Sequence, residues 1–96
     1  MWLCYNFRVE QLNLGQLLES QQMYPGALDA YQRSRRLEPD NQLAILLEAR
    51  VRLLRNEPNQ ARRLLNRLVD QDLVPGLTEL KERLTEQLET LQAEQR

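Results

Sequence analysis

Three short stretches decide the fold of this 96-residue chain: they read LGQLL at residues 14–18, ALDAY at residues 27–31 and LEPDN at residues 37–41. In the first two, apolar side chains recur every three or four residues, which is the spacing of one face of an α-helix. The third contains Pro39, and a proline there marks a helix boundary because its ring cannot continue a helix interior. We therefore expect two helices followed by a turn into a third.

Prolines mark helix boundaries along the rest of the chain as well. Four prolines divide it into five segments, and each segment carries apolar residues at helical spacing: Pro25, Pro39, Pro58 and Pro75. No segment alternates apolar and polar residues over the length of a strand. The pattern predicts five helices near residues 6–22, 25–37, 41–56, 58–71 and 77–94. Because the connections are short, neighbouring helices are expected to run antiparallel.

The composition is that of one small helical domain and excludes several kinds of chemistry. Apolar residues make up 42% of the chain and charged residues 28%, and leucine alone occupies 21 positions. There is no histidine, which removes His-based acid–base catalysis and most zinc or haem ligation. The single cysteine, Cys4, cannot form an intrachain disulfide. We expect no catalytic residues, cofactor or metal, and no stretch is long and apolar enough to insert into a membrane.

Charge is distributed unevenly although the net charge is only −1. Residues 33–67 carry nine arginines against four acids, whereas residues 68–96 carry three bases against seven acids. This profile differs from the strongly basic one typical of nucleic-acid binders, so we expect no nucleic acid as partner. Five arginines of the basic segment form either a patch for an acidic protein or solvated helix faces with local acidic partners: Arg33, Arg36, Arg62, Arg63 and Arg67.

Small residues repeat along the chain at an interval of 34. Gly15 and Ala49 are separated by this interval, and so are Ala27 and Ala61. Small side chains at these positions let the two helices of a hairpin approach closely, while a large apolar residue four positions later fills the gap between hairpins. The sequence therefore predicts two copies of one helical hairpin.

These motifs resemble the tetratricopeptide repeat, a 34-residue helical hairpin with Leu-Gly, Ala-x-x-x-Phe and a closing proline. The resemblance covers residues 8–41 as a first repeat and residues 42–75 as a second. The second copy departs from the pattern, with Glu48 and Arg52 where large apolar residues are usual and Leu73 in place of the closing proline. The resemblance implies a single all-α domain of two hairpins, with residues 76–96 as a capping helix. An ordinary antiparallel helical bundle is the alternative.

The resemblance also implies a function, because the first helix of each repeat lines a concave groove that binds a partner protein. We expect the groove to receive an amphipathic or extended peptide, with Arg50 pairing an acidic group on it. Eight side chains would line it: Leu12, Gln16, Leu43, Leu46, Arg50, Leu53, Leu80 and Leu84. In the alternative arrangement, Leu46, Leu53, Leu80 and Leu84 pack on each other as core.

The N-terminal segment is unusually rich in large apolar side chains: Trp2, Leu3, Tyr5 and Phe7. Aromatic residues are enriched at protein interfaces, so a second hypothesis is a homodimer formed through these residues and the leucine faces. An upstream helix of a longer chain would cover them equally well, so whether this array is a piece of a larger protein stays open. The compartment stays open, with the cytoplasm favoured over the periplasm.

Overall fold

The computed structural model describes residues 2–69 and 72–95, with side chains from Phe7 onward. Within these residues the chain forms five α-helices and no strand, which confirms the all-α prediction. The helices are α1 (Trp2–Ser20), α2 (Tyr24–Leu37), α3 (Gln42–Leu54), α4 (Pro58–Asn66) and α5 (Thr78–Glu94). Helix α1 begins four residues before the predicted position 6, and α4 ends five residues before the predicted position 71.

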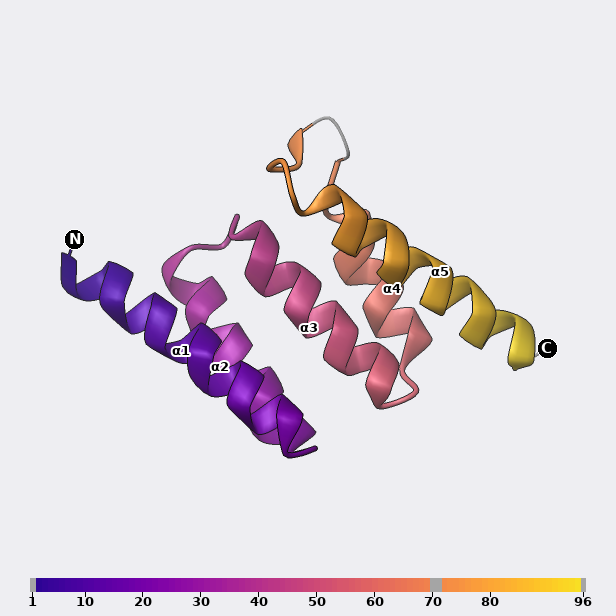
Figure 1. Cartoon of the computed structure of the whole chain (residues 1–96), viewed down its shortest axis with the longest axis horizontal. Helices are drawn as coiled ribbons and strands as arrows, with labels where there is room; N and C mark the ends of the chain where they lie inside the picture. Colours follow the sequence, from indigo (N-terminus) through magenta and orange to yellow (C-terminus); the bar gives the residue numbers. More distant parts are fainter. Residues whose placement is uncertain (1, 70–71, 96) are drawn as a thin grey trace.

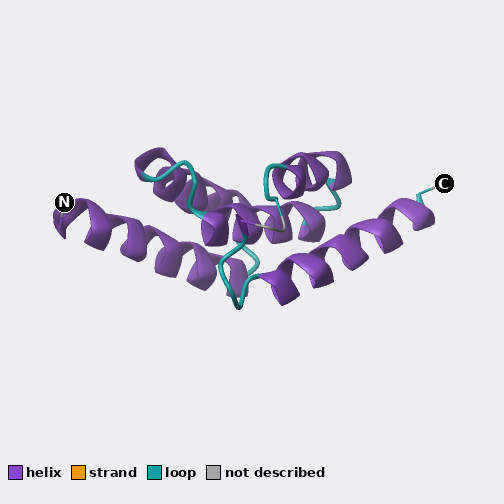
Figure 2. Ribbon diagram, turned by 90° about the horizontal axis from the view of Figure 1, so that it is seen from above, coloured by secondary structure: helices purple, strands orange, loops and turns teal. Residues whose placement is uncertain are grey.

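The helices form a stack of antiparallel pairs (Figure 1). The main contacts join α1 to α2, α2 to α3, α3 to α4, and α5 to both α3 and α4. Seen from above, α2 and α4 lie in a back layer, while α1 and α5 extend towards the two ends of the chain on the other side (Figure 2). Helices α1, α3 and α5 run in the same direction (Figure 1), and we call the side of the molecule that they form the α1–α3–α5 face.

The turns inside the two hairpins have the same geometry. Gln22 and Asn56, which are 34 residues apart, both adopt a left-handed backbone with φ values of 62° and 63°. One residue later, the amide of Met23 donates to the carbonyl of Leu18 and that of Glu57 to the carbonyl of Arg52, both at 2.8 Å. A left-handed residue with this backward hydrogen bond is a Schellman motif, which ends a helix and reverses the chain. The repeat interval is therefore present in the backbone as well as in the side chains.

Two apolar clusters form the interior. The first joins α1, α2 and α3 around Tyr31, which is fully buried. The second joins α3, α4 and α5 and includes Leu46, Leu65 and Leu84. In the first hairpin, a Cβ atom on Gly15 would lie only 2.3 Å from Cε1 of Tyr31, so the ring packs directly on the glycine backbone. The small residue predicted at this position therefore has the predicted role of allowing close approach.

The junction between the hairpins is held by a cap and an ion pair. The side chain of Asn41 accepts a hydrogen bond from the amide of Ala44 at 3.1 Å and so caps α3. Behind it, Arg35 of α2 pairs with Glu48 of α3, whose side chain is buried. A buried carboxylate needs such a partner, because an unpaired charge would lose its hydration without compensation. Glu48, which departs from the repeat pattern, is thus a link between hairpins.

The prediction that α4 continues to residue 71 is wrong, and tertiary contacts explain why. Lys81 of α5 donates to the carbonyl of Leu68 at 2.9 Å, which engages a backbone group just after α4 ends. The amide group of Gln42 then donates to the carbonyl of Asp72 at 2.7 Å and accepts from the amide of Val74 at 2.8 Å. These side chains hold the connecting segment against α3 and α5 in place of another turn of helix.

The α1–α3–α5 face as a candidate binding site

The predicted groove leucines of the second half pack on each other. Leu46 and Leu84 are buried in the second apolar cluster, and Leu53 and Leu80 are partly buried against it. This is the arrangement that the alternative reading describes. Leu46 and Leu84 present no surface to a partner, so they leave the set of candidate contact residues. Leu53 and Leu80 keep some exposure at the edge of the cluster.

Three further predicted groove residues, Leu12, Gln16 and Leu43, lie in the first half of the chain. Leu12 is buried in the first cluster, and Leu43 is partly buried against the same cluster. Gln16 is exposed. The structure therefore divides the predicted groove between two clusters and does not gather its eight residues into one continuous apolar surface.

Arg50 is already paired within the chain. Its guanidinium contacts both carboxylate oxygens of Glu19, with Nε 2.6 Å from Oε2 and Nη2 3.0 Å from Oε1. The hydroxyl of Tyr31 donates to the same Glu19 Oε1 at 2.8 Å. We expected Arg50 to pair an acid on a partner, but the structure supplies that acid from α1. The opposite charges of Arg50 and Glu19, on the first helices of the two predicted repeats, were the signal in the sequence.

The environment of this network shifts the pKa of two of its members. Burial raises the pKa of the Tyr31 phenol well above its ordinary value, and the adjacent Glu19 carboxylate raises it further. Burial alone lowers the pKa of Arg50, but the hydrogen bond and negative charge of Glu19 reverse that effect and raise it overall. Arg50 therefore stays charged and Tyr31 stays neutral at ordinary pH, so the network acts as a fixed brace between α1, α2 and α3.

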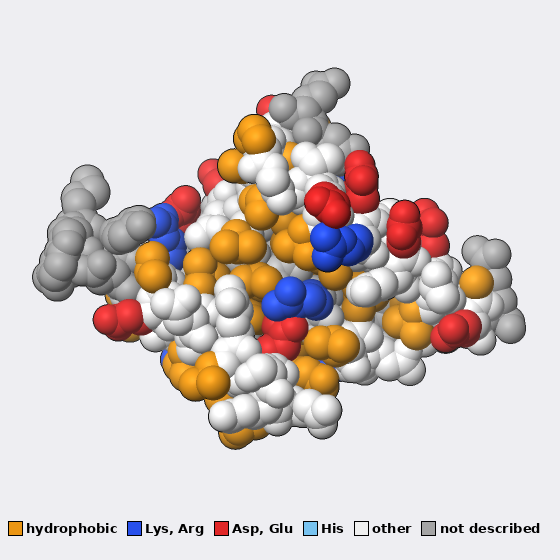
Figure 3. Space-filling view, viewed as in Figure 1, with side chains coloured by type: hydrophobic (Ala, Val, Ile, Leu, Met, Phe, Trp, Pro, Cys, Tyr) orange, Lys and Arg blue, Asp and Glu red, His pale blue; other side chains and the backbone are white. Residues whose placement is uncertain are grey.

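A hollow of about 500 Å³ opens between the C-terminal halves of α3 and α5. Leu53 and Leu54 of α3 and Leu91 of α5 supply its apolar wall. Its charged lining consists of two carboxylates and one guanidinium: Glu86, Glu94 and Arg83. At the end of α5, Gln95 donates to the side chain of Asn56 at 2.8 Å, which ties α5 to the turn after α3. Figure 3 shows apolar side chains gathered across the middle of the α1–α3–α5 face, with acidic and basic side chains among them.

Sequence reasoning missed this hollow. Leu54 is 51% exposed although it follows the partly buried Leu53 directly, and it was not among the predicted groove residues. Two adjacent leucines at the end of a helix were the available signal, since only one of them can face the core. Glu86 and Glu94 belong to the predicted capping helix, and only the placement of α5 brings them beside Leu54.

The apolar N-terminal segment lies partly outside the described side chains. The side chains of Trp2, Leu3 and Tyr5 lie outside the described part of the chain, whereas Phe7 is exposed. Further along α1, Leu14 and Leu17 are exposed as well. Positions 7, 14 and 17 share one side of the helix, because residues seven and ten apart differ by less than a quarter turn. This side of α1 is an apolar stripe, which we call the α1 stripe.

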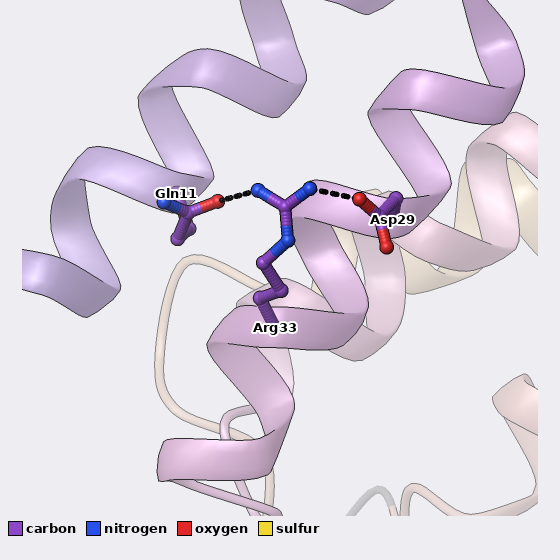
Figure 4. A network of polar contacts seen from close by, with 3 residues as sticks. All are labelled: Gln11, Asp29 and Arg33. Carbon is purple, nitrogen blue, oxygen red and sulfur yellow. Dashed lines mark hydrogen bonds and ion pairs between the residues drawn. The ribbon is translucent and has the colours of Figure 1, made fainter.

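Elsewhere, polar contacts join helices within one hairpin. Arg33 of α2 pairs with Asp29 one turn earlier and donates to Gln11 of α1 at 3.0 Å (Figure 4). Within the described part of the chain, no three His, Cys, Asp or Glu residues gather where they could hold a metal ion. Nor does any helix there combine the length and the apolar character needed to cross a membrane.

Comparison with known proteins supports the repeat pattern. A family model described as tetratricopeptide repeat matches residues 18–84, which include most of both predicted repeats and the first part of α5. Neither the curated proteins nor the solved structures contain a match to this chain. The repeat boundaries at residues 8–41, 42–75 and 76–96 stay predictions.

Proposed function

The chain belongs to the tetratricopeptide-repeat family, whose members generally mediate protein–protein interaction, and we propose that it is a non-catalytic module that binds a peptide of another protein. The binding surface is the hollow between α3 and α5, and it replaces the wider leucine groove. Its occupant is an amphipathic or extended peptide with one large apolar side chain and a neighbouring cation.

The exposed Leu54 beside Leu53 and Leu91 is the observation that carries this proposal. Burying a leucine side chain contributes about 1.5–3 kcal/mol. An apolar side chain that enters the hollow would bury its own apolar surface and that of the leucines around it. Glu86 and Glu94 then provide acceptors for a lysine or arginine of the peptide. The Gln95–Asn56 hydrogen bond holds the two walls together, which lowers the ordering cost of binding.

A displayed library of random twelve-residue peptides tests the proposal. We expect selection on the chain to enrich sequences with one large apolar residue next to lysine or arginine. A selected peptide is then measured by fluorescence anisotropy against Leu54→Asp and against Leu37→Asp. Leu37 is the matched control, because it is 44% exposed compared with 51% for Leu54 and lies at the end of α2, away from the hollow.

The expected result is an affinity loss of about tenfold or more for Leu54→Asp and little change for Leu37→Asp, with the helical circular dichroism of both variants unchanged. Equal affinity of the two variants would show that the hollow is not the binding surface. Enrichment of peptides without cations would remove the role assigned to Glu86 and Glu94.

Self-association through the α1 stripe is the second candidate function. Phe7, Leu14 and Leu17 are all exposed, and a cluster of large apolar side chains at a surface commonly marks an interface. Light scattering over a dilution series tests it, with Leu17→Lys as the variant. A molar mass that stays at the monomer value of 11.4 kDa at every concentration removes the homodimer.

A further inference from the structure

The arginines of this protein fall into two groups. Seven of those that the structure describes form ion pairs with acidic side chains of the same chain: Arg8, Arg33, Arg35, Arg50, Arg52, Arg55 and Arg83. The side chains of four others make no ion pair or hydrogen bond with any described residue: Arg36, Arg62, Arg63 and Arg67. All four are exposed and belong to α2, to α4 or to the residue directly after α4.

Three of these unpaired arginines gather on α4 and on the residue that caps its C-terminal end. The inner side of α4 consists of Ala61, Leu64 and Leu65, which are buried. At 100° per residue, Arg62, Arg63 and Arg67 share an outer arc of about 140°. We call this outer side of α4 the arginine face, and no acidic residue occurs between Pro58 and Val69. The nearest acids come from other segments, since Asp40 and Asp72 line a depression beside Arg67.

The position of the arginine face makes it independent of the hollow. Helix α4 lies in the back layer with α2, on the opposite side of the molecule from α1 and from the outer part of α5 (Figure 2). Favourable interaction with the helix dipole explains one cation in the last turn. It does not explain three, with a fourth at the end of the neighbouring α2. Unpaired guanidinium groups therefore concentrate on one side of a protein that otherwise pairs its arginines.

We propose that the arginine face is a second docking surface, which binds an acidic peptide segment of a partner protein. Each guanidinium presents a planar fork of donors that matches a carboxylate, so aspartate and glutamate side chains are suitable acceptors. The face is short for a nucleic acid, and it carries no aromatic side chain on which a base could stack. Helix α5, with five glutamates against two cations, would also repel an extended polyanion that ran beyond α4.

A fluorescein-labelled peptide of ten residues with alternating aspartate and alanine tests this proposal, measured by anisotropy at low and at physiological salt. The variant replaces Arg62, Arg63 and Arg67 by Gln, which removes the charge and keeps much of the side-chain size. Arg33→Gln is the control, because Arg33 is a part-exposed arginine that pairs with Asp29 on α2 and lies outside the hollow. A ten-nucleotide oligothymidylate serves as the competing polyanion.

We expect the unmodified protein to bind the acidic peptide and to lose affinity as salt rises, because exposed charges are screened. The triple variant is expected to bind it about tenfold more weakly, since each exposed ion pair contributes little alone. Arg33→Gln keeps the unmodified affinity. Equal binding by the triple variant overturns the proposal. Tighter binding of the oligothymidylate with the same dependence on the three arginines also overturns it and assigns the face to nucleic acid.

Discussion

The two hairpins of this protein share one backbone plan and fill it with different side chains. Both turn at a left-handed residue, Gln22 in the first and Asn56 in the second, and both start their second helix with a proline in the first turn. Their interiors differ. The first pairs Gly15 with the large ring of Tyr31, whereas the second has Ala49 and the smaller Leu65 at the equivalent positions.

This difference shows what the 34-residue plan requires. The turn and the small residue on the first helix are kept, because they set how closely the two helices approach. The small residue on the first helix and the large residue on the second helix together fill the space between the two helices. The larger ring of Tyr31 therefore needs glycine opposite it, whereas the smaller Leu65 leaves space for the methyl group of Ala49. Packing at protein density permits such exchange only when the total volume is conserved.

Replacing Gly15 by Ala gives the largest expected effect. The added Cβ would lie 2.3 Å from Cε1 of Tyr31, and the fully buried ring has no free space to enter. Overpacking of this kind costs about 1–3 kcal/mol, and we expect the free energy of unfolding in urea to fall by that amount. The reverse change in the second hairpin, Ala49→Gly, is expected to cost about 1 kcal/mol through helix propensity and lost packing.

The double variant Gly15→Ala with Tyr31→Leu sharpens this test, because it gives the first hairpin the residues of the second. We expect it to be more stable than the sum of the two single effects predicts, since the smaller side chain removes the clash. Strict additivity of the two effects in this double-mutant cycle would mean that Gly15 and Tyr31 have no interaction free energy.

Alkaline pH is expected to weaken the first hairpin and to leave the second unaffected. The pKa of Tyr31 is raised in the folded state from its ordinary value of 10.0, whereas Leu65 does not titrate. The unfolded chain therefore releases the Tyr31 proton first, and this contribution to stability is complete below pH 10 and lost as pH rises above it. The loss is at most about 1.4 kcal/mol per pH unit.

Urea unfolding at pH 9 and pH 11 measures this loss, with Tyr31→Phe as the control. Other groups that titrate in this range affect both proteins, so the difference between them isolates Tyr31. If the unmodified protein and Tyr31→Phe lose the same stability over this range, the phenol is not held neutral by burial and Glu19.

The turns give the smallest expected effect. Glycine adopts a positive φ without strain, so Gln22→Gly is expected to stabilise the protein by about 0.5–1 kcal/mol. Asn56→Gly is expected to be nearly neutral, because asparagine tolerates this conformation and its side chain also accepts from Gln95. Thermal unfolding of the two variants checks the difference, and a larger gain for Asn56→Gly would contradict it.

Much of the fold could be predicted from the sequence, because its signals are local. Proline positions and leucine spacing predicted five helices, and the interval between Gly15 and Ala49 predicted two related hairpins. The end of α4 could not be predicted in this way. Leu68 and Val69 continue the helical spacing, and only side chains far along the chain, Gln42 and Lys81, give that segment another set of hydrogen bonds.

The candidate site was harder to predict than the fold, because it depends on how α5 crosses α3. Leu46 and Leu84 have the pattern of groove residues, but α5 lies close enough for both to be buried. The same placement leaves Leu54 exposed beside Glu86 and Glu94. Helical spacing identifies the apolar side of each helix, whereas the part of that side that a neighbour covers is a property of the packed array.

The amide of Gln42 has a consequence for the order in which the chain folds. It holds both Asp72 and Val74, about 30 residues away, whereas the hairpin turns close over a few residues. Local closures cost less chain entropy and form faster than distant ones. We therefore expect each hairpin to form early and α5 to dock last, after the first turn of α3 is in place.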